Sequence, residues 1–297
     1  MKIRIGVSLG AEGAPDGFAA AVDLLEAAGI DSLWLPEHVY GPAVEPFTGM
    51  AFALSRTRHL KAGSGISVLP GRHPALVAKQ LASLAGLAPR RVLPVFGLQP
   101  AAPAERAAFP VPPGPGQRAE VFDEALTLLR RLLTADEPVT FEGRYFSVSG
   151  ATAGPRPANP LDIWLAGSAP GALRRAGRLA DGWLGSLMTP GEAGEAVRAI
   201  QAAAAEAGRQ VDPEHFGMSM AIAFGAVPDS FAASVARRRP GVAPESLAAG
   251  GWSGARQLIL AYAEAGLSKF VVRPVGREVS LAEFLDGFTR EIMPLQT

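Results

Sequence analysis

The chain has 297 residues, of which 48% are hydrophobic and 19% charged, so it carries enough apolar material for one large core. Lys plus Arg and Asp plus Glu number 28 each, and this balance excludes a strongly basic surface for nucleic acid or an anionic membrane. The lack of cysteine excludes disulfides and thiol nucleophiles and fits a cytoplasmic protein. With neither a signal-peptide run nor a membrane-spanning run, no membrane partner is expected.

Short apolar runs alternate with Ala- and Leu-rich helical stretches along the whole chain. The expected strands are 3–9, 32–35, 60–69, 92–96, 161–165, 182–184, 216–225 and 269–273. The expected helices are 18–28, 74–87, 122–133, 169–179, 191–207, 255–265 and 281–292. Eight strands that alternate with helices favour a parallel α/β fold closed into a (β/α)₈ TIM barrel, as a single domain over residues 1–297.

Three stretches depart from this repeat and are expected to be insertions. Residues 100–118 are rich in Pro, Ala and Gly, which is typical of a loop. Residues 136–160 carry alternating apolar residues on both sides of Glu142-Gly143, which predicts a β-hairpin before the fifth strand. Residues 227–254 follow the seventh strand and contain a run of three arginines, 237–239. We interpret this run as a solvated loop, with ligand binding as the alternative.

The working residues of a parallel barrel come from the C-terminal ends of its strands. His38 follows the second strand, where an imidazole could exchange a proton with a bound ring or could be a structural histidine bonded to a nearby loop. Glu37 is expected to face the opposite way. The histidines show no metal-ligand spacing, and no strand is followed by a P-loop or a nucleophile elbow. These features predict a bound organic cofactor that carries the chemistry itself, and no metal.

Glycines mark two further candidate contacts. Gly167-Ser168 precede a helix that starts near Ala169, and its free N–H groups would suit a phosphate, although Ser168 could equally be a simple helix cap. Gly65-Ile66 interrupt the third strand. A glycine there indicates either a bulge pressed against a planar ring or a bend required by packing.

Five phrases together resemble the luciferase-like monooxygenase superfamily, and more closely its members that use the deazaflavin coenzyme F420. They are DSLWLPEH (31–38), SGISVLPGRHP (64–74), AKQLASL (78–84), IWLAGS (163–168) and RAGRLADGW (175–183). The resemblance implies an F420-dependent oxidoreductase that transfers hydride between the deazaflavin and a small organic substrate, and it implies a homodimer. An FMN-dependent monooxygenase is the alternative. A non-catalytic barrel that has lost its cofactor is the second alternative.

The resemblance also implies roles for individual residues. His38 would be the catalytic residue beside the deazaflavin, and Gly65-Ile66 would form a non-proline cis peptide against the central ring. The expected cofactor contacts are Ser8, Glu37, Ser64, Gly65, Ile66, Ser67, Gly97, Gly167, Ser168, Ala169 and Trp183. Arg72 and Arg273 could meet acidic parts of the cofactor or substrate, although no motif places them. After the fourth strand, GLQP (97–100) replaces the family's Gly-x-Gly turn and following Glu. The nearest acid is Glu105, so a catalytic acid from this loop is doubtful.

Overall fold

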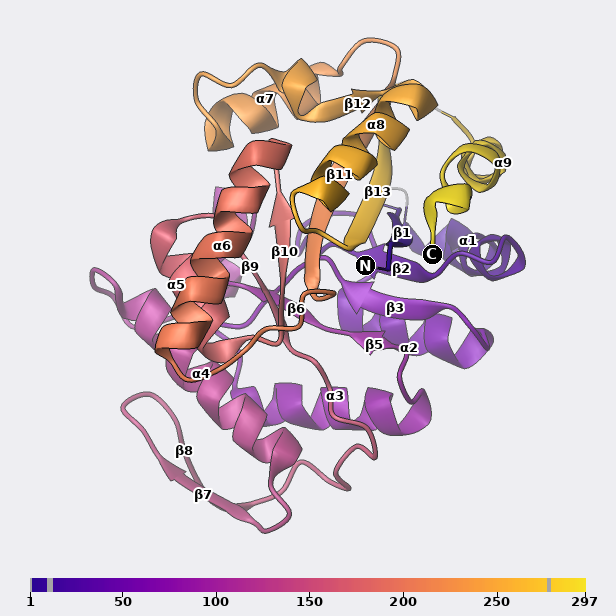
Figure 1. The fold of residues 1–297 in the computed structure, drawn as a ribbon. Helices are drawn as coiled ribbons and strands as arrows, with labels where there is room; N and C mark the ends of the chain where they lie inside the picture. The colour runs from indigo at the N-terminus through magenta and orange to yellow at the C-terminus, as the bar shows by residue number, and fades with distance from the viewer. Residues whose placement is uncertain (1, 10–12, 277–278) are drawn as a thin grey trace.

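The structure, a computed structural model, describes residues 2–9, 13–276 and 279–297. A curled, mostly parallel sheet lies at its centre, with helices around the outside (Figure 1). Its strand order is β4 (Ser67–Val68), β6 (Val95–Gly97), β9 (Trp164–Ala166), β10 (Gly182–Ser186), β11 (Phe216–Phe224), β13 (Lys269–Gly276), β1 (Arg4–Ser8), β2 (Ser32–Leu35), β3 (Lys61–Ser64) and β5 (Val92–Leu93). A further short strand, β12 (Ala248–Gly250), pairs with β11 away from this path.

Two of the predicted strands are interrupted. Residues 60–69 form β3 and β4, separated by Gly65-Ile66, and residues 92–97 form β5 and β6, separated by Pro94. Proline has no amide hydrogen for the sheet. The Ser64 hydroxyl bridges the strands here, because it accepts from the Val95 N–H at 2.9 Å and donates to the Val95 carbonyl at 3.0 Å. β3 pairs with β5 and β4 pairs with β6, so each interrupted strand continues beside the other.

Helices cover the outer face of the sheet with their apolar sides. They are α1 (Pro15–Ala27), α2 (Pro46–Arg56), α3 (Pro74–Leu87), α4 (Gln117–Thr134), α5 (Pro170–Leu179), α6 (Pro190–Glu206), α7 (Asp229–Arg238), α8 (Gly251–Glu264) and α9 (Leu281–Glu291). Five of them begin with proline, whose fixed φ suits a first helical position. α2 was not predicted. Its cap is Glu45, which accepts from the Thr48 N–H at 2.8 Å, and glutamate is outside the usual set of capping residues.

The apolar residues form a large core between sheet and helices and a smaller cluster inside the curl of the sheet. The inner cluster contains Trp34, Val95, Leu184 and Val271, all buried. These side chains come from β2, β6, β10 and β13, which are not neighbours in the sheet. They can therefore meet only across its concave side. This contact identifies the inward-facing residues of each strand, since successive side chains alternate between faces.

Residues 136–160 include an antiparallel hairpin that lies outside the helical layer, beside α4 (Figure 1). Its strands are β7 (Val139–Glu142) and β8 (Ser147–Ala151). The carboxylate of Glu124 on α4 accepts from the N–H groups of Arg144, Tyr145 and Phe146 at 2.9, 2.7 and 2.7 Å. One acidic side chain thus satisfies the turn and attaches the hairpin to the helix.

Residues 227–254 are folded, so the solvated-loop interpretation of this stretch is wrong. They form α7, a short 3₁₀ turn (Pro244–Ser246) and β12, which lie together at one end of the sheet (Figure 1). Phe231 and Val235, one helical turn apart, bury against Ala221 and Ala223 of β11. We call residues 227–250 the cap. Within 100–118, likewise, residues Pro103–Ala108 form a 3₁₀ helix.

A buried ion-pair cluster lies at the N-terminal ends of β2, β3 and β13. Asp31 accepts from the ammonium of Lys61 at 2.8 Å and from that of Lys269, and the Ser32 hydroxyl donates to it at 3.0 Å. Lys269 is 8% exposed. Burial raises the pKa of Asp31, but Lys269 and Lys61 lower it by more, so its pKa lies well below the ordinary value.

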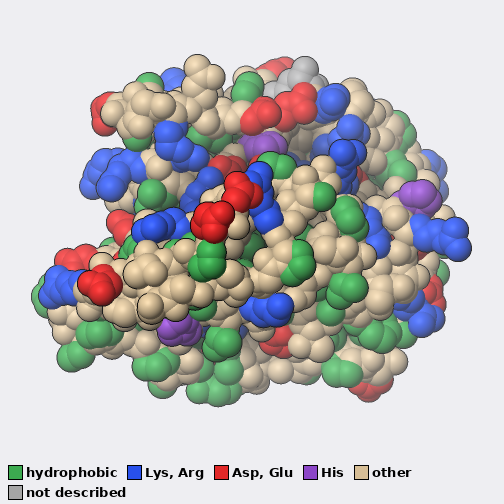
Figure 2. Space-filling view, turned by 90° about the horizontal axis from the view of Figure 1, so that it is seen from below, with side chains coloured by type: hydrophobic (Ala, Val, Ile, Leu, Met, Phe, Trp, Pro, Cys, Tyr) green, Lys and Arg blue, Asp and Glu red, His purple; other side chains and the backbone are tan. Residues whose placement is uncertain are grey.

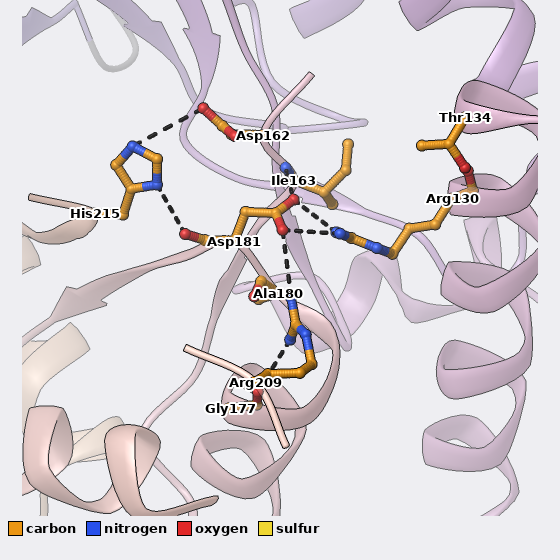
Figure 3. A network of polar contacts seen from close by, with 9 residues as sticks. All are labelled: Arg130, Thr134, Asp162, Ile163, Gly177, Ala180, Asp181, Arg209 and His215. Atoms are coloured by element: carbon orange, nitrogen blue, oxygen red, sulfur yellow. Dashed lines mark hydrogen bonds and ion pairs between the residues drawn. The ribbon is translucent and has the colours of Figure 1, made fainter. Parts of the chain in front are cut away.

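A second polar network joins the N-terminal ends of β9, β10 and β11 (Figure 3). Arg130 of α4 donates to both carboxylate oxygens of Asp181, at 2.6 and 2.8 Å. The same carboxylate accepts from the Ile163 N–H at 2.9 Å, while Nδ1 of His215 lies 2.9 Å from the Asp181 carbonyl. Both networks occupy the end opposite to the candidate site, so they serve stability.

Charged groups on the face seen in Figure 2 are interspersed, with basic and acidic side chains next to each other. Within the described ranges, no helix is long and apolar enough to cross a bilayer. The same residues contain no group of three or more acidic or histidine side chains arranged to hold a metal ion.

Candidate functional site

His38 stands on the exposed segment that follows the C-terminal end of β2. The strand itself is wholly buried, and Pro36 and Glu37 carry the chain outward to the histidine. The His38 carbonyl accepts from the Gly41 N–H at 3.2 Å, which closes a turn directly after it. Its imidazole makes no hydrogen bond to any described residue. The ring is therefore held by its backbone and left open for a ligand.

Glu37 faces the other way, as expected from strand alternation. Its side chain is 4% exposed and receives both guanidinium nitrogens of Arg72, at 2.9 and 2.7 Å. The same carboxylate accepts from the Val68 N–H at 2.8 Å. Glu37 thus fastens β4 to the segment that carries His38. Its carboxylate is directed at the protein, although a cofactor contact was expected for it.

The Gly65-Ile66 peptide bond is cis, as the resemblance implies. The Gly65 N–H donates to the Leu35 carbonyl at 2.7 Å, and the Ile66 carbonyl accepts from the Glu37 N–H at 3.3 Å. The bulge is thus bonded directly to the end of β2. The Ile66 side chain packs over Gly97, where a Cβ atom would stand only 2.0 Å from Cδ1 of Ile66. Gly97 therefore makes room for the bulge.

Three of the four serines expected at the site, namely Ser8, Ser64 and Ser67, are buried. Ser64 uses its hydroxyl between strands, and Ser8 ends β1 at 6% exposure. Ser67 is fully buried, and its hydroxyl has no hydrogen-bond partner among the described residues. Ser64 and Ser67 flank the Gly65-Ile66 bulge, and neither side chain reaches the surface.

The turn from β9 into α5 brings together Gly167, Ser168 and Ala169, all of them exposed. Gly167 has φ of +121°, a conformation that favours glycine, and its carbonyl accepts from the indole N–H of Trp183 at 2.9 Å. Ala169 is the N-cap, so the simple cap suggested for Ser168 is wrong. The first turn of α5 has neither a side-chain cap nor an acidic residue. Pro170 has no N–H, and the Ala172 N–H donates to the Ala169 carbonyl at 2.8 Å, so the Gly171 N–H is the first-turn donor left for an anion among the described residues. Trp183 is buried and holds the turn from behind.

Glu105, the acid nearest to the end of the fourth strand, lies against the turn that follows His38. Its side chain is 4% exposed although it lies in the 3₁₀ helix of the Pro-rich segment. One carboxylate oxygen accepts from the Tyr40 N–H at 3.4 Å, two residues after His38, and the other has no described partner. Burying an unpaired carboxylate oxygen is costly, which marks functional positions. The sequence signal for Glu105 is that it is the first acidic residue after the fourth predicted strand, 92–96.

Two cavities in the described part of the chain lie away from His38. One of about 290 Å³ opens at the N-terminal ends of the strands, beside Asp31 and His59. The other, of about 770 Å³, lies where β11 and β12 end, between Gly225, Gly250 and Val279.

The parallel α/β fold thus carries an exposed histidine, a cis-peptide bulge and an open helix N-terminus at the C-terminal ends of its strands. These ends are where parallel barrels place their working residues. The profile of the luciferase-like monooxygenase family matches residues 1–269. The chain therefore belongs to this family.

Curated relatives carry more specific names. The F420-dependent glucose-6-phosphate dehydrogenase of Beutenbergia cavernae is 35% identical over 191 residues, 61% of this chain and 56% of the relative. The enzyme of the same name from Nakamurella multipartita is 30% identical over 75% of this chain and 68% of the relative. The chain thus spans little more than half of the first of these relatives.

Solved structures share the fold at low identity. An F420-dependent secondary alcohol dehydrogenase in complex with an F420-acetone adduct has a TM-score of 0.80 and 22% identity, with both chains fully covered. The F420-dependent tetrahydromethanopterin reductase of Methanopyrus kandleri has a TM-score of 0.79 and 19% identity, again with full coverage of both. An FMN-containing Baeyer-Villiger monooxygenase of Pseudomonas putida has a TM-score of 0.75 and 18% identity, covering 99% of each chain.

Proposed function

We propose that this protein is an F420-dependent oxidoreductase that transfers hydride between the deazaflavin and a small organic substrate. The observation that carries the proposal is His38, exposed and with no hydrogen bond to its imidazole from any described residue, on a segment bonded to the Gly65-Ile66 bulge. Membership of the luciferase-like family and the names of the curated relatives support the choice of F420.

The residues present fit such a cofactor at two points. Ile66 and Gly65 are partly exposed and would lie against the ring system. The uncapped first turn of α5, with the exposed residues Gly167 to Ala169, would hold a phosphate through backbone N–H groups and the helix dipole. When bound, the deazaflavin supplies the hydride donor or acceptor, and the protein contributes orientation and a proton relay.

His38 and Glu105 are the two groups suited to that relay. The His38 imidazole is exposed and unbonded among the described residues, so either nitrogen is free to exchange a proton with a substrate hydroxyl or carbonyl oxygen. Glu105 is buried and accepts from the Tyr40 N–H within the turn that begins at His38, and its other carboxylate oxygen has no described partner. We assign His38 as the catalytic residue and Glu105 as the acid that exchanges protons near it.

The direct test is cofactor binding. Purified protein is titrated separately with F420 and with FMN, and quenching of each cofactor's fluorescence is followed. Saturable binding of F420 is the expected result. Binding of FMN alone would favour the FMN-dependent monooxygenase, for which the shared fold of the Pseudomonas enzyme is the supporting observation. If neither cofactor binds, the non-catalytic barrel is favoured.

The catalytic assignment is tested with His38→Ala and Glu105→Gln, using His59→Ala as the matched control. His59 is also exposed, but it lies beside the cavity at the opposite end of the sheet. Glucose 6-phosphate and propan-2-ol, suggested by the names of the relatives, serve as trial substrates. His38→Ala should keep its F420 affinity and lose turnover by about 10²–10⁴-fold, while His59→Ala should match the wild type. Unchanged turnover in His38→Ala would refute its role.

We further propose that the interrupted pairs β3–β4 and β5–β6 each count as one strand. The sheet then closes as a barrel of eight strands within a single domain, 1–297. A homodimer is proposed from the apolar residues left exposed on α2 and α3, namely Phe52, Leu76 and Leu87, at 42%, 68% and 83% exposure. Sedimentation velocity tests it. The cytoplasmic location and the absence of a nucleic-acid partner stay predictions.

A further inference from the structure

Two arginines meet at the inner rim of the sheet, away from His38 and the α5 turn. Arg273 of β13 lies two residues after Val271, which belongs to the inner cluster, so its side chain starts from the same concave face. Ser186, the last residue of β10, lies two residues after Leu184 of the same cluster. Both positions therefore face the space above the inner cluster.

The cap brings the second arginine to this place. The ring of Phe231 on α7 lies 5.8 Å from the Arg273 guanidinium carbon. At the end of the same helix, Arg238 donates to the Ser186 hydroxyl at 3.2 Å. α7 is anchored by the apolar cluster around Phe231 and Val235. Helix α7 thus brings both guanidinium groups to the same part of the rim of the sheet.

Their charges are not balanced by acidic groups. No described carboxylate pairs with Arg238 or Arg273, whereas the adjacent Arg239 pairs with Glu192. Loss of water contact, and then repulsion from Arg238, lowers the pKa of Arg273. Loss of water contact, and then Arg237, lowers the pKa of Arg238. Both guanidinium groups nevertheless stay protonated near neutral pH.

The position of Arg238 at the end of α7 has a simpler explanation, because a cation there is favoured by the helix dipole. That explanation does not extend to Arg273, which lies on a strand and is partly buried against an aromatic ring. Two like charges near each other, one of them hydrogen-bonded to a hydroxyl, repel each other and cost free energy unless an anion pairs with them. A bound anion would remove that cost.

We propose that Arg273 and Arg238, together with the Ser186 hydroxyl, bind an oxyanion carried by the substrate, a phosphate or a carboxylate. This inference rests on the proposed function, because it names the substrate class of the same site. The planar guanidinium forks match the geometry of both anions. Arg273 lies on β13, and only β1 separates β13 from the strand that leads to His38. A substrate anchored at Arg273 would extend from there toward the catalytic histidine.

The test uses inorganic phosphate as the probe, by isothermal titration calorimetry at constant ionic strength. The variants are Arg273→Gln and Arg238→Gln, with Arg237→Gln as the control that removes the same charge one residue away. We expect phosphate affinity to fall about tenfold or more in the first two and less than about twofold in the control. Equal affinity in all four proteins, or no binding to the wild type, would overturn the proposal.

A second arm separates a substrate anion from the phosphate of the cofactor. F420 affinity is measured by fluorescence for the wild type, Arg273→Gln and Arg238→Gln, and it should be the same in all three. If F420 affinity falls together with phosphate affinity, the arginines serve the cofactor and the proposal is wrong. If F420 fails to bind the wild type while phosphate still distinguishes the variants, the anion site stands and the proposed function fails. Should Arg273→Gln not fold, the exposed Arg238→Gln decides the result.

Discussion

Asp31→Asn is the sharpest test of how the N-terminal ends of the strands are held together. The substitution keeps the shape of the side chain and removes its charge, so Lys269 keeps its burial and loses its carboxylate. Removing one partner of a buried ion pair costs about 3–5 kcal/mol. Lys61 is one third exposed and can turn to water, so most of this cost falls on Lys269.

The unfolding free energy lost in Asp31→Asn has an upper limit, because Lys269 can lose its proton instead of remaining charged. Neutralising a lysine of ordinary pKa at pH 7 costs about 1.4 kcal/mol per pH unit, or about 5 kcal/mol in total. Burial already lowers the pKa of Lys269 in the folded protein. We therefore expect Asp31→Asn to lose about 3–5 kcal/mol of unfolding free energy at pH 7.

Urea unfolding, followed by tryptophan fluorescence, measures this difference, with Asp23→Asn as the control. Asp23 pairs with Arg56 on the surface, and both side chains are about half exposed, so its loss should be hard to resolve. The lowered pKa of Asp31 means that its contribution is present above its unfolded pKa near 4 and is lost as the pH falls further. The gap between wild type and variant should therefore shrink in acid. A loss at pH 7 no greater than that of Asp23→Asn would refute the reasoning.

Three further outcomes are expected. Burial, and then Glu192, raises the pKa of Tyr262 to about 12. Its contribution to stability is thus present below pH 10 and lost as the pH rises through 12. Tyr262→Phe should lack this alkaline loss, which amounts to about 1.4 kcal/mol between pH 9 and pH 11 in urea titrations. Gly167→Ala, at φ of +121°, should cost about 1–3 kcal/mol and weaken F420 binding, whereas Gly191→Ala in an open helical position should do neither. Glu37→Gln removes the charge that pairs with Arg72 and should lower the unfolding free energy by about 1–3 kcal/mol. Glu120→Gln, whose pair with Arg144 is exposed, should change it little, and equal urea midpoints for the two variants would contradict this.

Much of the fold was predictable because local signals agreed with the tertiary structure. The predicted helix 74–87 and strand 32–35 coincide with α3 and β2. The interruption at Gly65-Ile66 was indicated by the glycine, whereas the bridge from Ser64 to Val95 could not be predicted locally, because the two residues lie 31 positions apart along the chain. α7 was missed because the arginine run at its C-terminal end suggested a solvated loop, while the pair Phe231 and Val235 was the informative signal.

The residues of the candidate site were likewise predictable only in part. His38, the cis Gly65-Ile66 bond and the Gly167 turn follow strand ends or known phrases, so the sequence located them. Glu105 and Arg238 reach the strand ends on segments that return from elsewhere, and the path of such a segment depends on packing that no periodicity encodes. Glu37 was expected to face away from His38 and was also named as a cofactor contact, and the position of Arg72 shows that its carboxylate pairs within the protein.

The cap has its own small apolar cluster, separate from the main core. Its stability therefore depends on few residues of the scaffold, chiefly Ala221 and Ala223 of β11. Residues 227–250 could be exchanged for a segment of different length and charge while these two alanines are kept. Because the proposed anion site uses Arg238 of the cap, this segment is the place to introduce changes when the protein is to be redirected toward other substrates.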